Sequence, residues 1–313
     1  MLARVAENLY WMGRHIERVD FCNRFIEVQF FNSLSAPMSG HKDFILRSIL
    51  YVSGSSFDSS SPLSEQEVWR TVIFDPLNPS SMFSSINRAR ENARSIRNTI
   101  SAELWEAINK WYIFCKNRSH QEFYSSDLFW FSEQIIANQA LIKSTMVNTI
   151  LHDDVWHFLN VGISLERTMQ VLKIIRTKIS DSAILSNSGA LVSLKLFQMS
   201  VMLRSIGAYD VHQTINKTTL MTTETIFNLV FSNDMFPRST ISSTRKIYSH
   251  LSCIHVESDE VEDFTMDFKS KMNLFNEFSD YSDEDAVIQH IEAMDHWLLE
   301  SHEKIQDIFF LKD

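Results

Sequence analysis

Glutamate and arginine stand side by side twice in this sequence, each time four and five residues after a glycine. The first copy is Gly13-x-x-x-Glu17-Arg18 and the second is Gly162-x-x-x-Glu166-Arg167, which begins 149 residues later. Arginine binds carboxylates and phosphates through two parallel hydrogen bonds, and a neighbouring carboxylate can hold an amine or accept a proton. Such a mixed pocket would suit a zwitterionic ligand, for example an amino acid or the end of a peptide.

Further charged side chains could join these pairs in one site. Glu17 and Glu166 are the candidate catalytic bases. The candidate ligand-binding set comprises Glu7, Arg14, Glu17, Arg18, Arg90, Arg94, Arg97, Glu103, Glu106, Glu166, Arg167 and Arg204. The alternative is an internal network of Glu–Arg ion pairs that fixes the register of packed helices and binds nothing. The sequence leaves both interpretations open.

Motifs for other chemistries are missing. The sequence has no G-x-S-x-G elbow, P-loop or G-x-G-x-x-G loop, so no nucleotide cofactor is expected. Cys22 and Cys115 occupy apolar helical positions that are typical of inert core thiols. His152, Asp153, Asp154 and His157 could hold a metal ion, but Asp153 and Asp154 also lie where a helix is expected to begin and would complement its dipole. We therefore predict a cap there and no metal site.

The elements that position these residues are predicted to be helices. Only 6 Gly and 5 Pro interrupt long apolar-periodic segments. The first helix carries an apolar stripe from Leu2 to Val19, spaced three and four residues apart. Its other side combines Glu7, Arg14, Glu17 and Arg18 with four aromatic residues. A solvated face would not collect Tyr10, Trp11, Phe21 and Phe25. This helix is therefore expected to be buried nearly all round, with its charges in a crevice or a paired network.

Serine and proline mark the ends of later helices. A short helix is predicted over 65–74, because Asp75-Pro76 and Pro79 forbid its continuation. Ser80 or Ser81 can cap the next helix, and Ser101 the one after it.

The second half of the chain repeats the plan of the first. Besides the two Glu-Arg motifs, Asn78-Pro79-Ser80-Ser81 recurs 158 residues later as Phe236-Pro237-Arg238-Ser239. The sequence thus predicts an all-α helical bundle of two related halves, 1–150 and 151–255, followed by an acidic helical segment, 256–313. An approximate two-fold axis between the halves would bring the two Glu-Arg helices together.

Charge and hydropathy limit the environment and the partners. The net charge is −10, and the chain from Val256 onward holds 17 acidic residues against 4 basic ones. This balance argues against nucleic acid and anionic membranes as partners, and Glu91 and Glu103 flank the Arg90-Arg94-Arg97 stripe. No apolar window reaches transmembrane length, the N-terminus does not resemble a signal peptide, and the three cysteines form no CxxC pair. A cytoplasmic location is expected.

Several stretches together resemble one protein family. The opening MLARVAENLYWMGRHIER of residues 1–18 looks like the start of the alpha-E family, which is named for helices bearing a Glu-Arg motif. Four further stretches match in order over roughly residues 1–240: FDPLNPSS at 74–81, RARENARSIR at 88–97 continuing to ELWEAIN at 103–109, WHFLNVGISLER at 156–167, and LRS at 203–205 with Tyr209. The resemblance also has a gap, because the family usually has arginine after the second glycine, where this chain has Ile163.

The resemblance implies a neighbourhood and no reaction. Members of the family are bacterial, and their genes lie beside, or are fused to, genes for ATP-grasp ligase-like proteins and transglutaminase-like proteases. This association suggests an accessory or binding component of a peptide-forming or peptide-modifying system, with such a protein as partner and a peptide or amino acid as ligand. Two alternatives stay open: an enzyme acting on a small peptide or amino acid through Glu17 or Glu166 with the clustered arginines, and a purely structural assembly protein.

Overall fold

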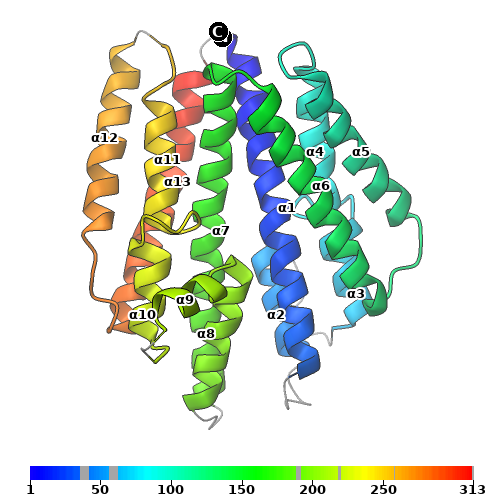
Figure 1. The fold of residues 1–313 in the computed structure, drawn as a ribbon, viewed down its shortest axis with the longest axis vertical. Coiled ribbons are helices and arrows are strands. Elements are labelled where there is room, and N and C mark those ends of the chain that lie inside the picture. Colours follow the sequence, from blue (N-terminus) through cyan, green and yellow to red (C-terminus); the bar gives the residue numbers. More distant parts are fainter. Residues whose placement is uncertain (36–41, 56–62, 188–191, 218–219, 257, 312–313) are drawn as a thin grey trace.

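The protein is a bundle built around two long helices that lie against each other (Figure 1). The structure is a computed structural model that describes residues 1–35, 42–55, 63–187, 192–217, 220–256 and 258–311. These residues form helices and no strand, which confirms the predicted all-α class. The central pair is α1 (Ala3–Ser35) and α7 (Asp154–Asn187), the two helices that carry the Glu-Arg motifs.

Helices from the first part of the chain cover one side of this pair. They are α2 (Lys42–Ser53), α3 (Glu65–Trp69) with the π-helical turn η1 (Arg70–Phe74), α4 (Met82–Ser95), α5 (Ala102–Ser119), the 3-10 turn η2 (Ser125–Asp127) and α6 (Leu128–Thr149). Helix α4 packs directly on α1, and α5 packs on α4 and α6. The sequence prediction of a short helix ending before Asp75-Pro76 is confirmed by α3 and η1.

The remaining helices cover the other side (Figure 1). They are α8 (Val192–Ile206), α9 (Tyr209–Ile215), α10 (Thr223–Phe227) with the π-helical turn η3 (Asn228–Ser232), α11 (Thr240–Leu251), α12 (Asp259–Asn276) and α13 (Glu284–Phe309). Helix α11 packs on α7, and α13 reaches both α7 and α1. The acidic segment after Val256 is therefore part of the bundle, with Val287, Leu298 and Ile305 in the core.

Serine hydroxyls start the helices at the predicted places. The Ser81 hydroxyl accepts from the Ser84 amide at 3.1 Å, and the Ser101 hydroxyl accepts from the Leu104 amide at 3.1 Å. Ser239 does the same for Ser242 at the start of α11, also at 3.1 Å. Asp153 accepts from the Val155 amide at 3.0 Å, so the cap expected at the start of α7 is confirmed.

Two local features each occur twice in the chain. The π-helical turns η1 and η3 each follow a short helix and precede a serine-capped one, α4 and α11. Gly54 follows α2 with a φ of 75°, and Gly207 follows α8 with a φ of 76°. Both glycines have a left-handed backbone that other residues rarely adopt.

Candidate functional site

The closest approach of α1 and α7 occurs at the two glycines of the motifs. A Cβ atom on Gly13 would lie 2.3 Å from the Leu159 carbonyl oxygen, and one on Gly162 would lie 2.1 Å from the Tyr10 carbonyl oxygen. Only glycine lets two backbones pass this closely. The glycines thus hold the helices at a separation where a side chain one turn further along can reach across to the opposite helix.

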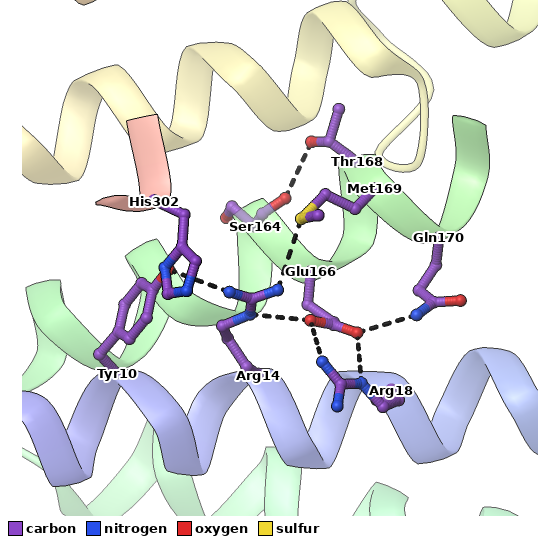
Figure 2. A network of polar contacts seen from close by, with 9 residues as sticks. All are labelled: Tyr10, Arg14, Arg18, Ser164, Glu166, Thr168, Met169, Gln170 and His302. Carbon is purple, nitrogen blue, oxygen red and sulfur yellow. Dashed lines mark hydrogen bonds and ion pairs between the residues drawn. The ribbon is translucent and has the colours of Figure 1, made fainter. Parts of the chain in front are cut away.

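Glu166 of α7 lies between two arginines of α1 (Figure 2). Arg14 Nε donates to Oε2 at 2.8 Å, while Arg18 donates through Nε to Oε1 at 2.7 Å and through Nη2 to Oε2 at 3.0 Å. Gln170 Nε2 adds a fourth bond, to Oε1 at 2.8 Å. Both carboxylate oxygens are therefore fully occupied.

Glu17 of α1 makes the reciprocal contact with α7. Arg167 Nε donates to Glu17 Oε1 at 2.6 Å, and Lys143 Nζ of α6 lies 3.5 Å from Oε2. Lys143 also binds Asp20 at 3.1 Å, and Arg238 binds Asp20 at 2.8 Å. Each Glu-Arg motif therefore pairs with the other one and not within itself.

Burial and charge act in opposite directions on these carboxyl groups. Burial alone would raise the pKa of Glu166, but the attraction of Arg18 and Arg14 outweighs it and holds that pKa well below its usual range. Burial likewise opposes ionisation of Glu17, and Arg167 and Lys143 still lower its pKa. Both groups are charged at neutral pH, and neither is a good proton acceptor.

A cavity of about 360 Å³ opens beside Glu166. Four cations line it, namely Arg14, Arg18, Lys173 and Arg176, against the two carboxylates Glu166 and Asp295. Burial lowers the pKa of Lys173, while Glu166 partly restores it. The wall is completed by polar groups of Ser53, Ser80 and Gln170, by Gly54, and by the apolar side chains of Met169 and Leu299. The cationic side chains of the cavity lining therefore outnumber its carboxylates.

Helix α13 closes one side of this site. Asp295 and Leu299 line the cavity, and burial raises the pKa of Asp295 although Arg176 and Lys173 act against it. One turn further, Tyr10 hydroxyl lies 2.7 Å from His302 Nδ1 and 3.4 Å from Arg14 Nη1. Burial lowers the pKa of His302 to about 4, so its ring is neutral at pH 7 and can accept from Tyr10.

The arginine stripe of α4 lies elsewhere. Arg90 donates to Asn109 at 2.8 Å, and both Arg90 and Arg94 pair with Glu91. Arg97 lies over the Trp105 ring at 5.5 Å. Glu103 is exposed in the first turn of α5, and Glu106 faces Lys110 at 3.7 Å. The cavity beside Glu166 is lined by none of the five predicted residues of this region, which are Arg90, Arg94, Arg97, Glu103 and Glu106.

The two remaining predicted residues line other hollows of the surface. Glu7 lies near the end of α13, in a depression shared with Glu303 and Asp307. Arg204 of α8 lies over the Tyr209 ring at 3.8 Å and lines a separate, larger cavity. The structure thus brings together Arg14, Arg18 and Glu166 at one cavity, and joins Glu17 to Arg167 in a buried pair behind them.

The histidine cluster and the two buried cysteines lie in surroundings typical of structural residues. His157 Nδ1 lies 3.0 Å from His250 Nδ1, and no group of side chains in the described ranges has the makeup of a metal site. Burial raises the pKa of the Cys22 thiol to about 12. Cys115 is also buried and its pKa is raised further, so both thiols are protonated at neutral pH. No helix in the described ranges combines the length and apolarity of a membrane span.

Sequence reasoning missed part of the cavity. Lys173 and Arg176 follow Glu166 on the same side of α7, seven and ten residues later, so a helical-face count would have found them. Asp295, Ser53 and Ser80 come from segments far away in the chain and carry no local signal.

Comparison with known proteins adds the family. No curated protein and no solved structure matches the chain. A family model named Alpha-E, described as a predicted alpha-helical domain with a conserved ER motif, matches residues 1–310. The paired Glu17-Arg18 and Glu166-Arg167 steps fit that description. The chain therefore belongs to the Alpha-E family.

Proposed function

We propose that the cavity beside Glu166 binds the carboxylate end of a small peptide-like ligand. The observation that carries the proposal is the charge of the cavity lining, which has four cations and two carboxylates. Glu166 is already satisfied by Arg14, Arg18 and Gln170. Asp295 lies 3.9 Å from Arg176, so the further attraction comes mainly from Lys173. Lys173 is a partly buried cation whose pKa burial lowers, and an incoming carboxylate would compensate that burial.

Binding is better supported than base catalysis by the motif glutamates. A general base needs a pKa near the working pH, and ion pairs hold those of Glu17 and Glu166 below their usual range. Glu17 is fully buried and lines none of the described cavities. A purely structural network would need no cavity beside it, so the open space at Arg18 and Lys173 favours a ligand.

The carboxylate hypothesis is tested by calorimetric titration with N-acetyl-alanylalanine and with its C-terminal amide. The acid should bind, and the amide should bind at least about tenfold more weakly because it lacks the charge that the cations attract. Inorganic phosphate, run as a further arm, shows whether any anion suffices. Equal affinity for acid and amide, or no binding of either at millimolar concentration, would refute the proposal.

Variants assign the binding to the cavity. Lys173→Met keeps the length of the side chain and leaves the Glu166 ion pairs in place, and it should weaken binding of the acid about tenfold. Arg94→Ala removes an exposed arginine outside the cavity and serves as the control. An unchanged affinity in Lys173→Met would place the ligand elsewhere.

We further propose that the chain acts as an accessory component of a peptide- or amide-forming system, with an ATP-grasp ligase-like protein or a transglutaminase-like protease as partner. Helix α6 supports a partner surface, because it keeps Phe129, Trp130, Ile136, Leu141 and Val147 exposed. Co-purification with an ATP-grasp ligase-like protein from the same organism tests the idea. Absence of co-elution at micromolar concentration would refute the proposal. Loss of co-elution in Trp130→Ser would show that the exposed apolar side chains of α6 bind the partner.

The organisation in two related halves, 1–150 and 151–255 with 256–313 added, is also a proposal. Its support is the exchange of partners between the two Glu-Arg motifs and the matching turns η1 and η3. If the halves arose by duplication, a chain carrying two copies of the first half should assemble its own Glu17–Arg18 exchange. A fully unfolded product would count against equivalent halves.

A further inference from the structure

A second cavity, of about 860 Å³, lies between α1, α8 and the start of α9. Helix α1 contributes Arg24 and Glu27, and the α8–α9 corner contributes Arg204 and Asp210. Each wall therefore presents one cation and one anion. Aromatic side chains, including Phe31, Phe197 and Tyr209, also line the cavity.

This second cavity occupies a place equivalent to the one beside Glu166. A Cβ atom on Gly54 would lie 3.3 Å from Lys173 Nζ, and one on Gly207 would lie 3.7 Å from Arg24 Nη1. Lys173 follows Arg24 by 149 residues, the same interval that separates the two Glu-Arg motifs. A left-handed glycine thus faces a cation of the opposite central helix in both cavities.

The charges of the two cavities differ at one matching position. Arg176, which lines the first cavity, follows Glu27 of the second by the same 149 residues. In total the first cavity carries four cations and two anions, whereas the second carries two of each. The second cavity is also larger and more extensively lined by apolar groups.

Polar groups at the second cavity are prepared for a ligand. Arg24 Nε and Asn32 Nδ2 are buried and have no hydrogen-bond partner within the described ranges. A buried donor without an acceptor is unfavourable, and a bound carboxylate would remove that penalty. Arg204 lies over Tyr209, which fixes the guanidinium plane, and Ser132 donates to Glu27 Oε2 at 2.7 Å. The charged groups are therefore partly held in position before any ligand arrives.

We propose that this cavity is a second ligand site, which takes a zwitterionic peptide of a few residues with a large apolar side chain. Arg24 and Arg204 face its carboxylate, Glu27 and Asp210 face its ammonium group, and Phe31, Phe197 and Tyr209 contact the side chain. This site is separate from the first cavity, beside Glu166, and does not depend on the function proposed for that cavity.

The test titrates alanylphenylalanine into the Lys173→Met variant, in which the first cavity is impaired. We expect binding, and an affinity about tenfold lower when Arg204→Ala or Asp210→Asn is added, because each removes one exposed charge from the cavity. Arg94→Ala in the same background should leave the affinity unchanged.

The same peptide with its amine acetylated and its carboxylate amidated tests the charge requirement. This blocked peptide should bind about tenfold more weakly or not at all. No binding of the free peptide, equal binding of the blocked one, or an affinity unaffected by both second-cavity variants would each overturn the proposal. A negative result here leaves the acid–amide comparison at the first cavity untouched, since that comparison uses a probe without an ammonium group.

Discussion

Gly13 and Gly162 are the contact points at which the two central helices meet. A Cβ atom on either would fall within 2.3 Å of a backbone oxygen of the opposite helix. Leu159 and Tyr10, which supply those oxygens, precede Gly162 and Gly13 by one turn each, so the contact is the same in both directions. The cross-helix pairing of Glu17 with Arg167 and of Glu166 with Arg18 depends on this short separation.

Replacing either glycine by alanine should destabilise the protein strongly. In an open helix position Gly→Ala would stabilise by up to about 1 kcal/mol, but here the added carbon forces two backbones apart. We expect Gly13→Ala and Gly162→Ala each to lower the free energy of unfolding by about 3 kcal/mol or more, measured by urea denaturation. Lys116→Ala, at an exposed position of α5, is the control. Unchanged stability in both glycine variants would contradict the close approach.

Loss of a buried carboxylate should be far more harmful than loss of an exposed one. Glu166→Gln leaves two arginine side chains without their counter-charge, one of them only 5 % exposed, and should lower the free energy of unfolding by about 3–5 kcal/mol. Glu91→Gln breaks pairs with Arg90 and Arg94 near the surface, and a change below about 1 kcal/mol is expected. Similar losses in both variants would show that the network is not sealed from solvent.

Mild acid should destabilise the protein through its buried histidines. Burial, with Arg18 adding to it, lowers the pKa of His15 to about 3 from 6.5. His15 therefore becomes protonated at a lower pH in the folded state than in the unfolded chain. The contribution of its neutral ring to folding stability is complete above pH 6.5 and is lost as the pH falls from there toward 3. Between pH 6.5 and about pH 5 the loss is about 2 kcal/mol.

His15→Phe isolates this contribution. Phenylalanine preserves the stacking on Trp11 and cannot be protonated, so its free energy of unfolding should fall by about 2 kcal/mol less than that of the wild type over the same pH interval. Glu166 does not confuse the comparison. Its pKa is lowered, so its contribution is present above 4.5 and is lost only at lower pH. Parallel pH profiles for the variant and the wild type would exclude His15 as the source.

The serine caps of α4 and α11 should contribute unequally to the stability of the protein. Ser81 accepts from the Ser84 amide and also donates to the Asp75 carbonyl at 2.7 Å. For Ser239 the structure records the cap to the Ser242 amide. Ser239→Ala is expected to destabilise by about 1 kcal/mol and Ser81→Ala by up to about 2 kcal/mol in thermal unfolding. The opposite order would show that the Asp75 contact adds nothing.

Much of the fold could be predicted from the sequence because the signals are local. The aromatic residues around the charges of α1 indicated burial, and Tyr10, Phe21 and Phe25 are all in the core. Serine caps placed the starts of α4 and α5 correctly, and Asp75-Pro76 placed the end of the helical segment before α4. One residue of the predicted apolar stripe, Leu2, lies just before α1 begins and is exposed.

The site was less predictable because tertiary packing decides which charges meet. The stripe of Arg90, Arg94 and Arg97 resembled a binding surface. In the fold, Arg90 and Arg94 of α4 pair with Glu91, and Arg97, just after α4 ends, lies over Trp105. Asp295 reaches the cavity from the acidic segment through the packing of α13 on α7, and the sequence gives no indication of that contact. Sequence periodicity shows which residues share a helical face, but only the fold shows which residues pack against that face.

The protonation of Lys173 tests the central claim most directly. Its side chain can be followed by NMR as the pH is varied, with and without saturating N-acetyl-alanylalanine. Burial lowers the pKa of Lys173 in the free protein, and a carboxylate bound in the cavity should move that pKa upward, while the amide leaves it unchanged. A Lys173 pKa that is the same with the acid, with the amide and with no ligand would contradict a carboxylate site beside Glu166.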